Sequence, residues 1–344
     1  MSPYINDILA QPGALRDALK HYPAEAIDPL RARLSKGEFD RIVLTGMGSS
    51  FNAAYPAWVN LLSLPLPVVL VNAAELLHYG QSMLTSRTLL WINSQSGRSV
   101  EIVRLLEALK DRRPAFQLSM TNYLDSPMAL NADLAVPIAA GAEATVSTKT
   151  YINMLAVLML ASAQLTGNDW RGLKASMARA ADAIESYLSG WQTHVQELDT
   201  LLGKVDQLVI LGRGASMSAV WNGSLINKEA AKCTFEGMNT ADFRHGPMEL
   251  ASHRLTVLML EGAAQTASLN RELALEVVRL GGRVLWLSPR PDEKLPTLRL
   301  PEVDEGVRPL VEILPLQMLT ILMARRNGFE PGEFRHIGKV TTQE

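Results

Sequence analysis

Residues 40–50 read DRIVLTGMGSS, and residues 206–216 read DQLVILGRGAS. Each segment begins with an acidic residue, continues with apolar and β-branched residues typical of a buried strand, and ends in two glycines, small residues and a serine. Every position of the second segment lies 166 residues after its counterpart in the first. A repeat of strand, glycine loop and helix start at a fixed spacing indicates two similar units in one chain.

Short apolar runs, each long enough for one strand, follow both copies of the repeat. They cover residues 68–72, 89–92, 116–120 and 134–138 after the first copy, and 256–260, 283–287 and 298–300 after the second. Segments with helical periodicity separate them, including residues 100–109, 151–165, 270–280 and 308–326. Strands that alternate with helices predict parallel sheets covered on both faces. We therefore predict an α/β fold of two doubly wound parallel-sheet domains, flavodoxin-like and related by internal duplication.

The predicted domain organisation follows from this repeat. Residues 169–203 are rich in alanine and charged residues and lack proline, which is typical of connecting helices and not of a flexible linker. The expected parts are an N-terminal helical segment (1–39), a first domain (40–168), connecting helices (169–203), a second domain (204–335) and a C-terminal tail (336–344).

Composition excludes several classes of protein. With 47% hydrophobic residues and a net charge of −2, the chain of 344 residues can bury a large core, and its scattered basic residues form no nucleic-acid footprint. Cys233 is the single cysteine, which excludes an internal disulfide and a cysteine-based zinc site, and the histidines show no ligand spacing. We expect no cofactor and no metal. The N-terminus lacks a secretory pattern, and the apolar window 152–163 is too short to cross a bilayer, so we expect a cytoplasmic protein without membrane contact.

Hydroxyl-rich segments stand at three predicted strand-to-helix junctions. They contain Ser49 and Ser50, then Ser94, Gln95, Ser96 and Ser99, then Ser147. Loops that follow the strands of a parallel sheet meet at its carboxyl edge, where N–H groups and helix N-termini favour a phosphate dianion. The alternative is that these serines only cap helices, which is their commonest role. Three clusters supply more donors than the caps require, so a phosphate site is favoured.

The two glycine loops do not match a dinucleotide fingerprint. That motif needs a third glycine three residues after the second one, where this chain has Phe51 and Met217. A tight turn explains the second loop equally well, and whether an effector binds there is left open.

Three further residues indicate a function only when they are considered together, because each of them alone is typical of an ordinary structural or surface position. Glu229 stands in LINKEAAK, His245 in DFRHGPMEL and Lys339 in FRHIGKVTTQE. With the serine segments, this arrangement resembles the double sugar isomerase (SIS) domain family over residues 40–344, in particular the isomerase domain of glucosamine-6-phosphate synthase and the stand-alone glucosamine-6-phosphate deaminase and fructosamine-6-phosphate deglycase members. The segments that carry the resemblance are GMGSS, SQSGRS, STK, KEAAKCTFEG, RHGP and RHIGKVT.

The resemblance implies a role for each residue. The residues expected to hold the substrate phosphate are Ser49, Ser50, Ser94, Gln95, Ser96 and Ser99. Ser147 and Glu236 would lie near the sugar, and Glu229 would move a proton between C1 and C2 of the open chain. His245 would assist ring opening from the neighbouring subunit of a homodimer. Lys339 would close the tail over the substrate and form an imine with a ketose carbonyl.

Two departures from the family pattern bear on the activity. Ile226 stands where the synthase has a lysine one turn before the glutamate, and the chain begins Met1-Ser2 without the cysteine nucleophile of a glutaminase. We therefore expect an aldose–ketose isomerase of an amino-sugar 6-phosphate that releases ammonia. The alternatives are a fructosyl-amine 6-phosphate deglycase and a non-catalytic sugar-phosphate-binding protein. Residues 151–165 and 221–233 are expected either at a dimer interface or in the core.

Overall fold

A computed structural model describes residues 1–336 and 338–341. The chain divides into two compact units. The first-sheet unit comprises Gly13–Glu143, Ser147–Ala178 and the described part of Arg335–Glu344, and the second-sheet unit comprises Met1–Pro12, Ala144–Val146 and Arg179–Phe334. Two of the points at which the chain passes from one unit to the other lie within helices, α2 (Gln11–His21) and α10 (Trp170–Ser189). Residues 337 and 342–344 of the predicted tail lie outside the described residues.

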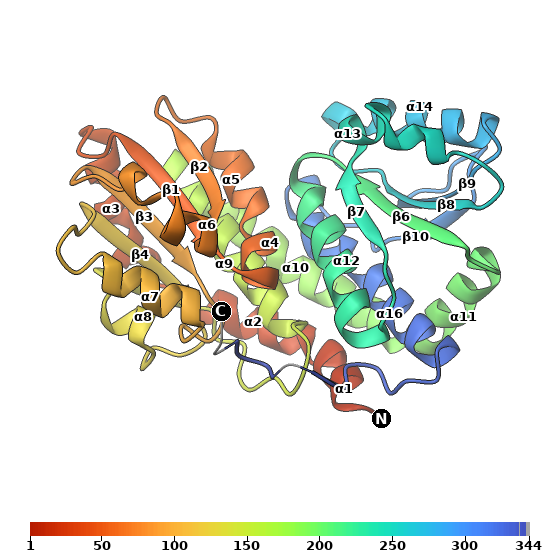
Figure 1. Cartoon of the computed structure of the whole chain (residues 1–344), viewed down its shortest axis with the longest axis horizontal. Coiled ribbons are helices and arrows are strands. Elements are labelled where there is room, and N and C mark those ends of the chain that lie inside the picture. The colour runs from red at the N-terminus through yellow and green to blue at the C-terminus, as the bar shows by residue number, and fades with distance from the viewer. Residues whose placement is uncertain (337, 342–344) are drawn as a thin grey trace. The chain divides into compact units, whose positions relative to one another are not determined.

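Five parallel strands form the sheet of the first-sheet unit (Figure 1). They are β1 (Arg41–Gly46), β2 (Val68–Asn72), β3 (Thr88–Asn93), β4 (Phe116–Thr121) and β5 (Leu134–Pro137). Their spatial order is β2-β1-β3-β4-β5, and β1 pairs in parallel with both β2 and β3. Every apolar run predicted for this half is a strand, and the residues of the central strand β3 are all buried, whereas the edge strand β2 is only half-buried.

Helices cover this sheet and one of them is buried on all sides. The helices of this unit, besides α2 and α10, are α3 (Ala24–Ser35), α4 (Gly48–Ala53), α5 (Tyr55–Leu61), α6 (Ala73–His78), α7 (Val100–Ala108), α8 (Pro127–Leu130) and α9 (Lys149–Thr166). Residues 150–165 of α9 are all buried, and the helix packs against α3, α4 and α5 of the same unit. Because apolar residues surround this helix, it forms the unit's core, as the second of the two alternatives for residues 151–165 predicts.

The second-sheet unit repeats the topology. Its strands are β6 (Gln207–Gly212), β7 (Glu236–Asn239), β8 (Leu255–Leu260), β9 (Arg283–Ser288) and β10 (Thr297–Arg299), all parallel, in the order β10-β9-β8-β6-β7. Counted from β6, this is the order of the first sheet, so the predicted duplication of a doubly wound α/β fold is confirmed. The sequence analysis missed β7, since Glu-Gly-Met-Asn is short and contains no apolar run.

Helices of the second-sheet unit fall where helical periodicity was expected, with one interruption. They are α1 (Pro3–Leu9), α11 (Trp191–Leu202), α12 (Met217–Ala231), α13 (Thr240–Arg244), α14 (Ala264–Arg279), α15 (Pro309–Glu312) and α16 (Leu314–Arg326). The single helix predicted for residues 308–326 is two helices, since Pro315 cannot donate the backbone hydrogen bond that would join them. Among the described residues, no helix is both long and apolar enough to span a membrane.

A carboxyl group is completely buried in the second-sheet unit. Glu312, at the end of α15, is 1% exposed and accepts a hydrogen bond of 2.8 Å from the Ser216 hydroxyl. Its Oε2 has no hydrogen-bond partner among the described residues. Burial raises the pKa of Glu312 to about 7, while the Ser216 hydrogen bond and the charge of Arg308 oppose the rise. The folded chain therefore retains the proton of Glu312 at pH values where an exposed glutamate is ionised.

This burial predicts a stability that falls as pH rises. Between pH about 4.5 and about 7 the unfolded chain releases the Glu312 proton and the folded chain keeps it, so the free energy of unfolding decreases across this window. Glu312→Gln, which keeps the Ser216 hydrogen bond without a charge, is expected to raise the unfolding free energy at pH 8 by on the order of 2 kcal/mol. Urea unfolding at pH 5 and pH 8 measures the difference. An equal effect of the substitution at both pH values would contradict the prediction.

Candidate active site

The strand order places a topological switch point at the carboxyl edge of the first sheet. In the order β2-β1-β3, chain connections leave β1 and β3 in opposite directions, so the loops after these two strands separate at their carboxyl ends. Such a reversal is where open α/β sheets bind ligands. The loops at this point are residues 46–50 and 94–99, which carry the first two serine segments of the sequence analysis.

A hydrogen bond joins these two loops. The backbone N–H of Gln95 donates to the Ser50 hydroxyl at 3.2 Å, and Ser49 lies in the same first turn of α4. Close packing requires the glycine at the start of this loop, since a Cβ on Gly46 would lie 2.7 Å from the carbonyl oxygen of Asn93. The structure therefore brings Ser50 and Gln95 together, as expected for residues that share one ligand.

The serines of the second loop shape a turn and do not cap the helix that follows. The Ser94 hydroxyl accepts from the Gly97 N–H at 3.1 Å, and the Ser96 hydroxyl accepts from the Arg98 N–H at 3.2 Å. Ser99 is the N-cap residue of α7, yet its side chain makes no capping hydrogen bond within the described residues. Hydroxyl groups that accept in this way keep a proton to donate to an anion. Ser94 and Ser96 therefore stabilise the turn, and their hydroxyl protons are not used in these two hydrogen bonds.

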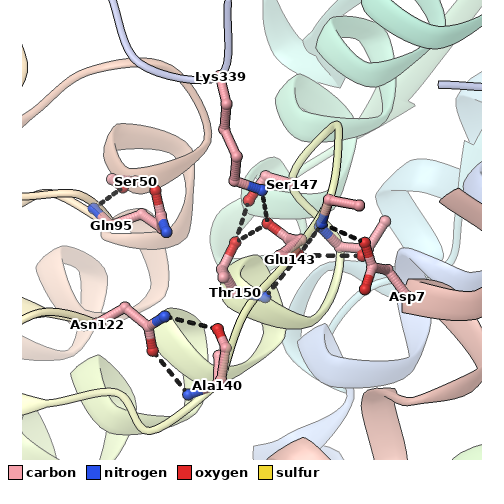
Figure 2. Close-up of polar contacts among 12 residues, drawn as sticks. Asp7, Ser50, Gln95, Asn122, Ala140, Glu143, Ser147, Thr150 and Lys339 are labelled. Atoms are coloured by element: carbon pink, nitrogen blue, oxygen red, sulfur yellow. Dashed lines mark hydrogen bonds and ion pairs between the residues drawn. The ribbon is translucent and has the colours of Figure 1, made fainter. Parts of the chain in front are cut away.

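The third hydroxyl segment surrounds a buried carboxylate (Figure 2). Both oxygens of Glu143 accept hydrogen bonds from the first turn of α9, and its side chain is 0% exposed. The Thr148 and Thr150 N–H groups donate at 2.8 and 3.0 Å, and their hydroxyls at 3.1 and 2.6 Å. Ser147 lies 2.8 Å from the Thr150 hydroxyl oxygen. Because the single Thr150 hydroxyl proton points to Glu143, Ser147 is the donor in that contact.

The C-terminal tail reaches two of these loops. The Lys339 ammonium lies 2.8 Å from Glu143 Oε2, as Figure 2 shows, and forms an ion pair with it. Two residues on, the carbonyl oxygen of Thr341 accepts from the Val100 N–H at 3.2 Å, at the first residue of α7. The tail is therefore tied both to the segment of Ser147 and to the helix that follows the serine turn.

Asn122 connects the loops after β3, β4 and β5. Its backbone N–H donates to the Gln95 carbonyl at 3.0 Å, and its side chain donates to the Gly141 carbonyl at 2.7 Å and accepts from the Ala140 N–H at 2.8 Å (Figure 2). Neither Asn122 nor Glu143 is among the residues predicted for the site. A signal existed for Glu143, the one acidic residue in the segment 141–150, because a carboxylate just before a helix suits its N-terminus.

The remaining predicted site residues belong to the second-sheet unit. Glu229 is partly buried in the last turn of α12, His245 is exposed at the end of α13, and Glu236 is exposed at the first residue of β7. Ile226, one turn before Glu229, is fully buried. The structure places these residues in a different unit from the serine loops and Lys339.

The second glycine loop differs chemically from the first. Ser216 is the counterpart of Ser50, and its hydroxyl donates to the carboxyl group of Glu312. An anion at this loop would therefore meet a carboxyl group of the same unit. Within residues 1–336 and 338–341, no three His, Cys, Asp or Glu side chains lie close enough to hold a metal ion.

Comparison with known families matches residues 38–163 to the model of the SIS domain. This part of the chain is a SIS domain. It contains the whole first sheet and the serines and glutamine predicted to contact a sugar phosphate. Lys339 lies outside the matched residues, in the C-terminal tail of the same unit.

The chain has relatives that match it along nearly its full length. It is 28% identical over 350 residues to glutamine–fructose-6-phosphate aminotransferase [isomerizing] of Pyrococcus horikoshii, with 99% of this chain and 57% of the relative covered. The enzyme of the same name from Methanothermobacter thermautotrophicus is 27% identical, again with 99% and 57% covered. The chain thus spans little more than half the length of these relatives.

Solved structures share the fold of the whole chain. The C-terminal domain of glucosamine-fructose-6-phosphate aminotransferase from Francisella tularensis superposes with a TM-score of 0.82 at 20% identity, covering 97% of this chain and 98% of that one. Glucosamine-6-phosphate deaminase from Thermotoga maritima gives 0.77 at 21% identity, covering 99% of both. Tagatose-6-phosphate ketose/aldose isomerase from Escherichia coli gives 0.80 at 20%, covering 98% and 97%.

The serine turn predicts a pair of contrasting glycine substitutions. Gly97 has a φ of +61°, and a Cβ on it would lie 2.6 Å from the Ser126 Cβ. Gly97→Ala is expected to lower the unfolding free energy by about 2–4 kcal/mol and to abolish binding of fructose 6-phosphate. Gly141 has a similar φ of +67° but open space around it, so Gly141→Ala adds only the strain of about 1 kcal/mol. Urea unfolding and calorimetric titration measure both. Equal losses in the two variants would contradict the assignment of the turn.

Proposed function

We propose that this protein is a sugar-phosphate isomerase that converts an amino-sugar 6-phosphate to a ketose 6-phosphate with release of ammonia. For glucosamine 6-phosphate, the reaction consumes one water and forms fructose 6-phosphate. The observation that carries the proposal is the ion pair of Lys339 with Glu143, since it brings the tail to the hydroxyl loops of the SIS domain. A site of hydroxyls, helix N-termini and one cation suits a polyhydroxylated anion.

The serine loops would hold the phosphate group. Ser50, Ser94 and Ser96 offer hydroxyl protons at the switch point of the sheet, and the N-terminus of α7 adds its positive end. Arg98, the charged residue of the loop, lies 3.1 Å from Asp125 and is partly exposed. Recognition therefore rests on hydroxyl and N–H donors, with Ser49, Gln95 and Ser99 completing the set. Ser147, whose own proton goes to Thr150, would accept from a sugar hydroxyl.

Glu229 would transfer the proton. In the open-chain aldose, a carboxylate removes the C2 proton, and the C–H electron pair forms a C1–C2 double bond while the carbonyl electrons move to the C1 oxygen, which takes a proton from water. The carboxyl group then delivers its proton to C1, and the nitrogen electron pair forms the double bond to C2. The resulting C2 iminium adds water and releases ammonia. His245 would open the ring by moving a proton between the ring oxygen and the C1 hydroxyl, which imidazole does near neutral pH. Its exposure at the end of α13 is compatible with donation from the partner subunit of a homodimer. Glu236 would contact the sugar from the same unit.

The names of similar proteins support this choice of substrate. They include an isomerizing aminotransferase of fructose 6-phosphate, a glucosamine-6-phosphate deaminase and a ketose/aldose isomerase of tagatose 6-phosphate. Each of the three names refers to a hexose 6-phosphate, and to its isomerisation or to the transfer or removal of an amino group. The deaminase and this chain cover 99% of each other.

The proposal predicts ammonia release from glucosamine 6-phosphate. Glu229→Gln is expected to lower kcat by at least about 100-fold, since it removes the proton acceptor but keeps the shape of the side chain. A coupled glutamate dehydrogenase assay measures ammonia, and calorimetric titration with fructose 6-phosphate confirms that the variant still binds sugar phosphate. Glu236→Gln serves as the matched carboxylate control, with a smaller loss of kcat.

Two results would contradict this prediction. Full activity of Glu229→Gln would exclude Glu229 as the base. Cleavage of a fructosyl-amine 6-phosphate, without ammonia from glucosamine 6-phosphate, would assign the protein to the deglycases.

A further inference from the structure

The segment between β5 and α9, residues 138–148, contains no helix or strand, and packing does not define its conformation throughout. Ala139 has a φ of +48°, in the left-handed region that a residue with a Cβ rarely adopts. Gly141 follows with a φ of +67°, and nothing lies within 4 Å of a Cβ built on it. Gly141 and Ala142 are exposed. Hydrogen bonds to the backbone are therefore what hold this turn in place.

One side chain, that of Asn122, supplies two of these hydrogen bonds. Its amide accepts from the Ala140 N–H at 2.8 Å and donates to the Gly141 carbonyl at 2.7 Å (Figure 2). An amide offers a donor and an acceptor in one plane, so the two bonds fix both the position and the orientation of the turn. A left-handed residue such as Ala139 persists only where its surroundings impose that conformation, and the half-buried Asn122 provides this constraint.

The backbone of Asn122 is bound on its other side to the loop after β3. Its N–H donates to the Gln95 carbonyl oxygen at 3.0 Å, and the Thr121 hydroxyl donates to the same oxygen at 3.2 Å. The Gln95 N–H in turn donates to the Ser50 hydroxyl at 3.2 Å. Asn122 thus joins the turn after β5 to the two loops at the switch point of the sheet.

The segment after β5 has a second anchor just beyond this turn. Glu143, two residues after Gly141, accepts from the N–H groups of Thr148 and Thr150 at 2.8 and 3.0 Å. The Thr150 hydroxyl donates to Glu143 at 2.6 Å and accepts from Ser147 at 2.8 Å. A continuous set of hydrogen bonds therefore runs from Asn122 and its turn to Ser147, and all of these residues belong to the first-sheet unit.

We propose that Asn122 is a positioning residue, whose amide sets the distance of the Ser147 segment from the serine loops to suit a hexose 6-phosphate. This inference rests on the proposed function, in which the serine loops hold the phosphate and Ser147 accepts from a sugar hydroxyl. Asn122 acts through these two segments and does not itself contact the sugar. A ligand that contacts both segments is sensitive to their spacing, whereas a ligand that contacts the serine loops alone is not.

Two ligands distinguish spacing from general stability. Inorganic phosphate tests the serine loops alone, and fructose 6-phosphate adds the sugar hydroxyls. Asn122→Ala leaves two backbone groups without their partner, so we expect it to lower the affinity for fructose 6-phosphate by about tenfold. The affinity for inorganic phosphate should stay within about twofold of the native value. Calorimetric titration measures both affinities.

The matched control is a second asparagine of the same unit. The Asn131 amide donates to the Pro127 carbonyl at 2.9 Å, beside the amino end of β5 and therefore at the sheet edge opposite the serine loops. Asn131→Ala also removes one amide that bonds to the backbone, and it should change neither affinity.

A double-mutant cycle tests whether Asn122 acts through the segment of Ser147. In the Ser147→Ala variant the sugar contact is already lost, so Asn122→Ala should lower the fructose 6-phosphate affinity by no more than about twofold, instead of about tenfold. A purely structural role would lower the affinity by the same factor in both backgrounds. Equal factors would overturn the inference.

The remaining outcomes separate this inference from the proposed function. A fall of both affinities by one factor in Asn122→Ala, or no fall in either, would contradict the positioning role alone. The expected affinities without release of ammonia from glucosamine 6-phosphate would contradict the proposed reaction alone. A native protein that binds neither ligand would contradict both. If Asn122→Ala does not fold, Asn122→Asp replaces it, since it keeps the acceptor for Ala140 and loses the donor to Gly141. In that variant, too, an equal fall of both affinities would exclude the role.

Discussion

Parallel pairing of β1 with both of its neighbours is the constraint on which the site depends. Because β2 lies on one side of β1 and β3 on the other, the connections after β1 and β3 diverge. The divergence leaves backbone N–H groups and helix N-termini at the sheet edge without a sheet partner, and a ligand anion can satisfy them. This strand order brings residues about forty-five positions apart in the sequence to within a hydrogen bond, as with Ser50 and Gln95.

The buried carboxylate of Glu143 has a second organising role in the same unit. A charge without access to water is tolerated only where several donors face it, and here one helical turn and one lysine supply them. The donors come from α9, the helix that forms the core, so the position of the carboxylate is as well defined as the core itself. The tail therefore contacts, through Lys339, a carboxylate that the first turn of the core helix holds in place.

The duplicated halves share their topology and differ in the use of their glycine loops. Ser50 contacts the neighbouring loop, whereas Ser216 contacts the buried carboxyl group of Glu312. Burial raises the pKa of this carboxyl group, so the core of the second half contains a group whose charge depends on pH. Duplication thus preserved the strand order, which backbone hydrogen bonding enforces, while side chains at equivalent positions took different partners. The SIS-domain model matches the first half, where the hydroxyl segments lie.

Strands and helices were largely predictable because their apolar patterns are local. The runs at 89–92 and 116–120 each became a strand, and the glycine loops marked the repeat; β7 escaped because its four residues carry no pattern. The serine clusters predict a phosphate site, because they supply more hydroxyl groups than helix capping requires, and this assignment stays a prediction.

The sequence by itself determined the fold class, the duplication and the residue types of the site. Only the tertiary structure decided the partner of each side chain: that Asn122 bridges three loops and that Glu143 pairs with Lys339, 196 positions away. It also decided that Ser216 contacts Glu312. The physical reason is that apolar periodicity is a property of neighbouring residues in the sequence. Hydrogen bonds and ion pairs between distant residues form only once the packed core has brought those residues together.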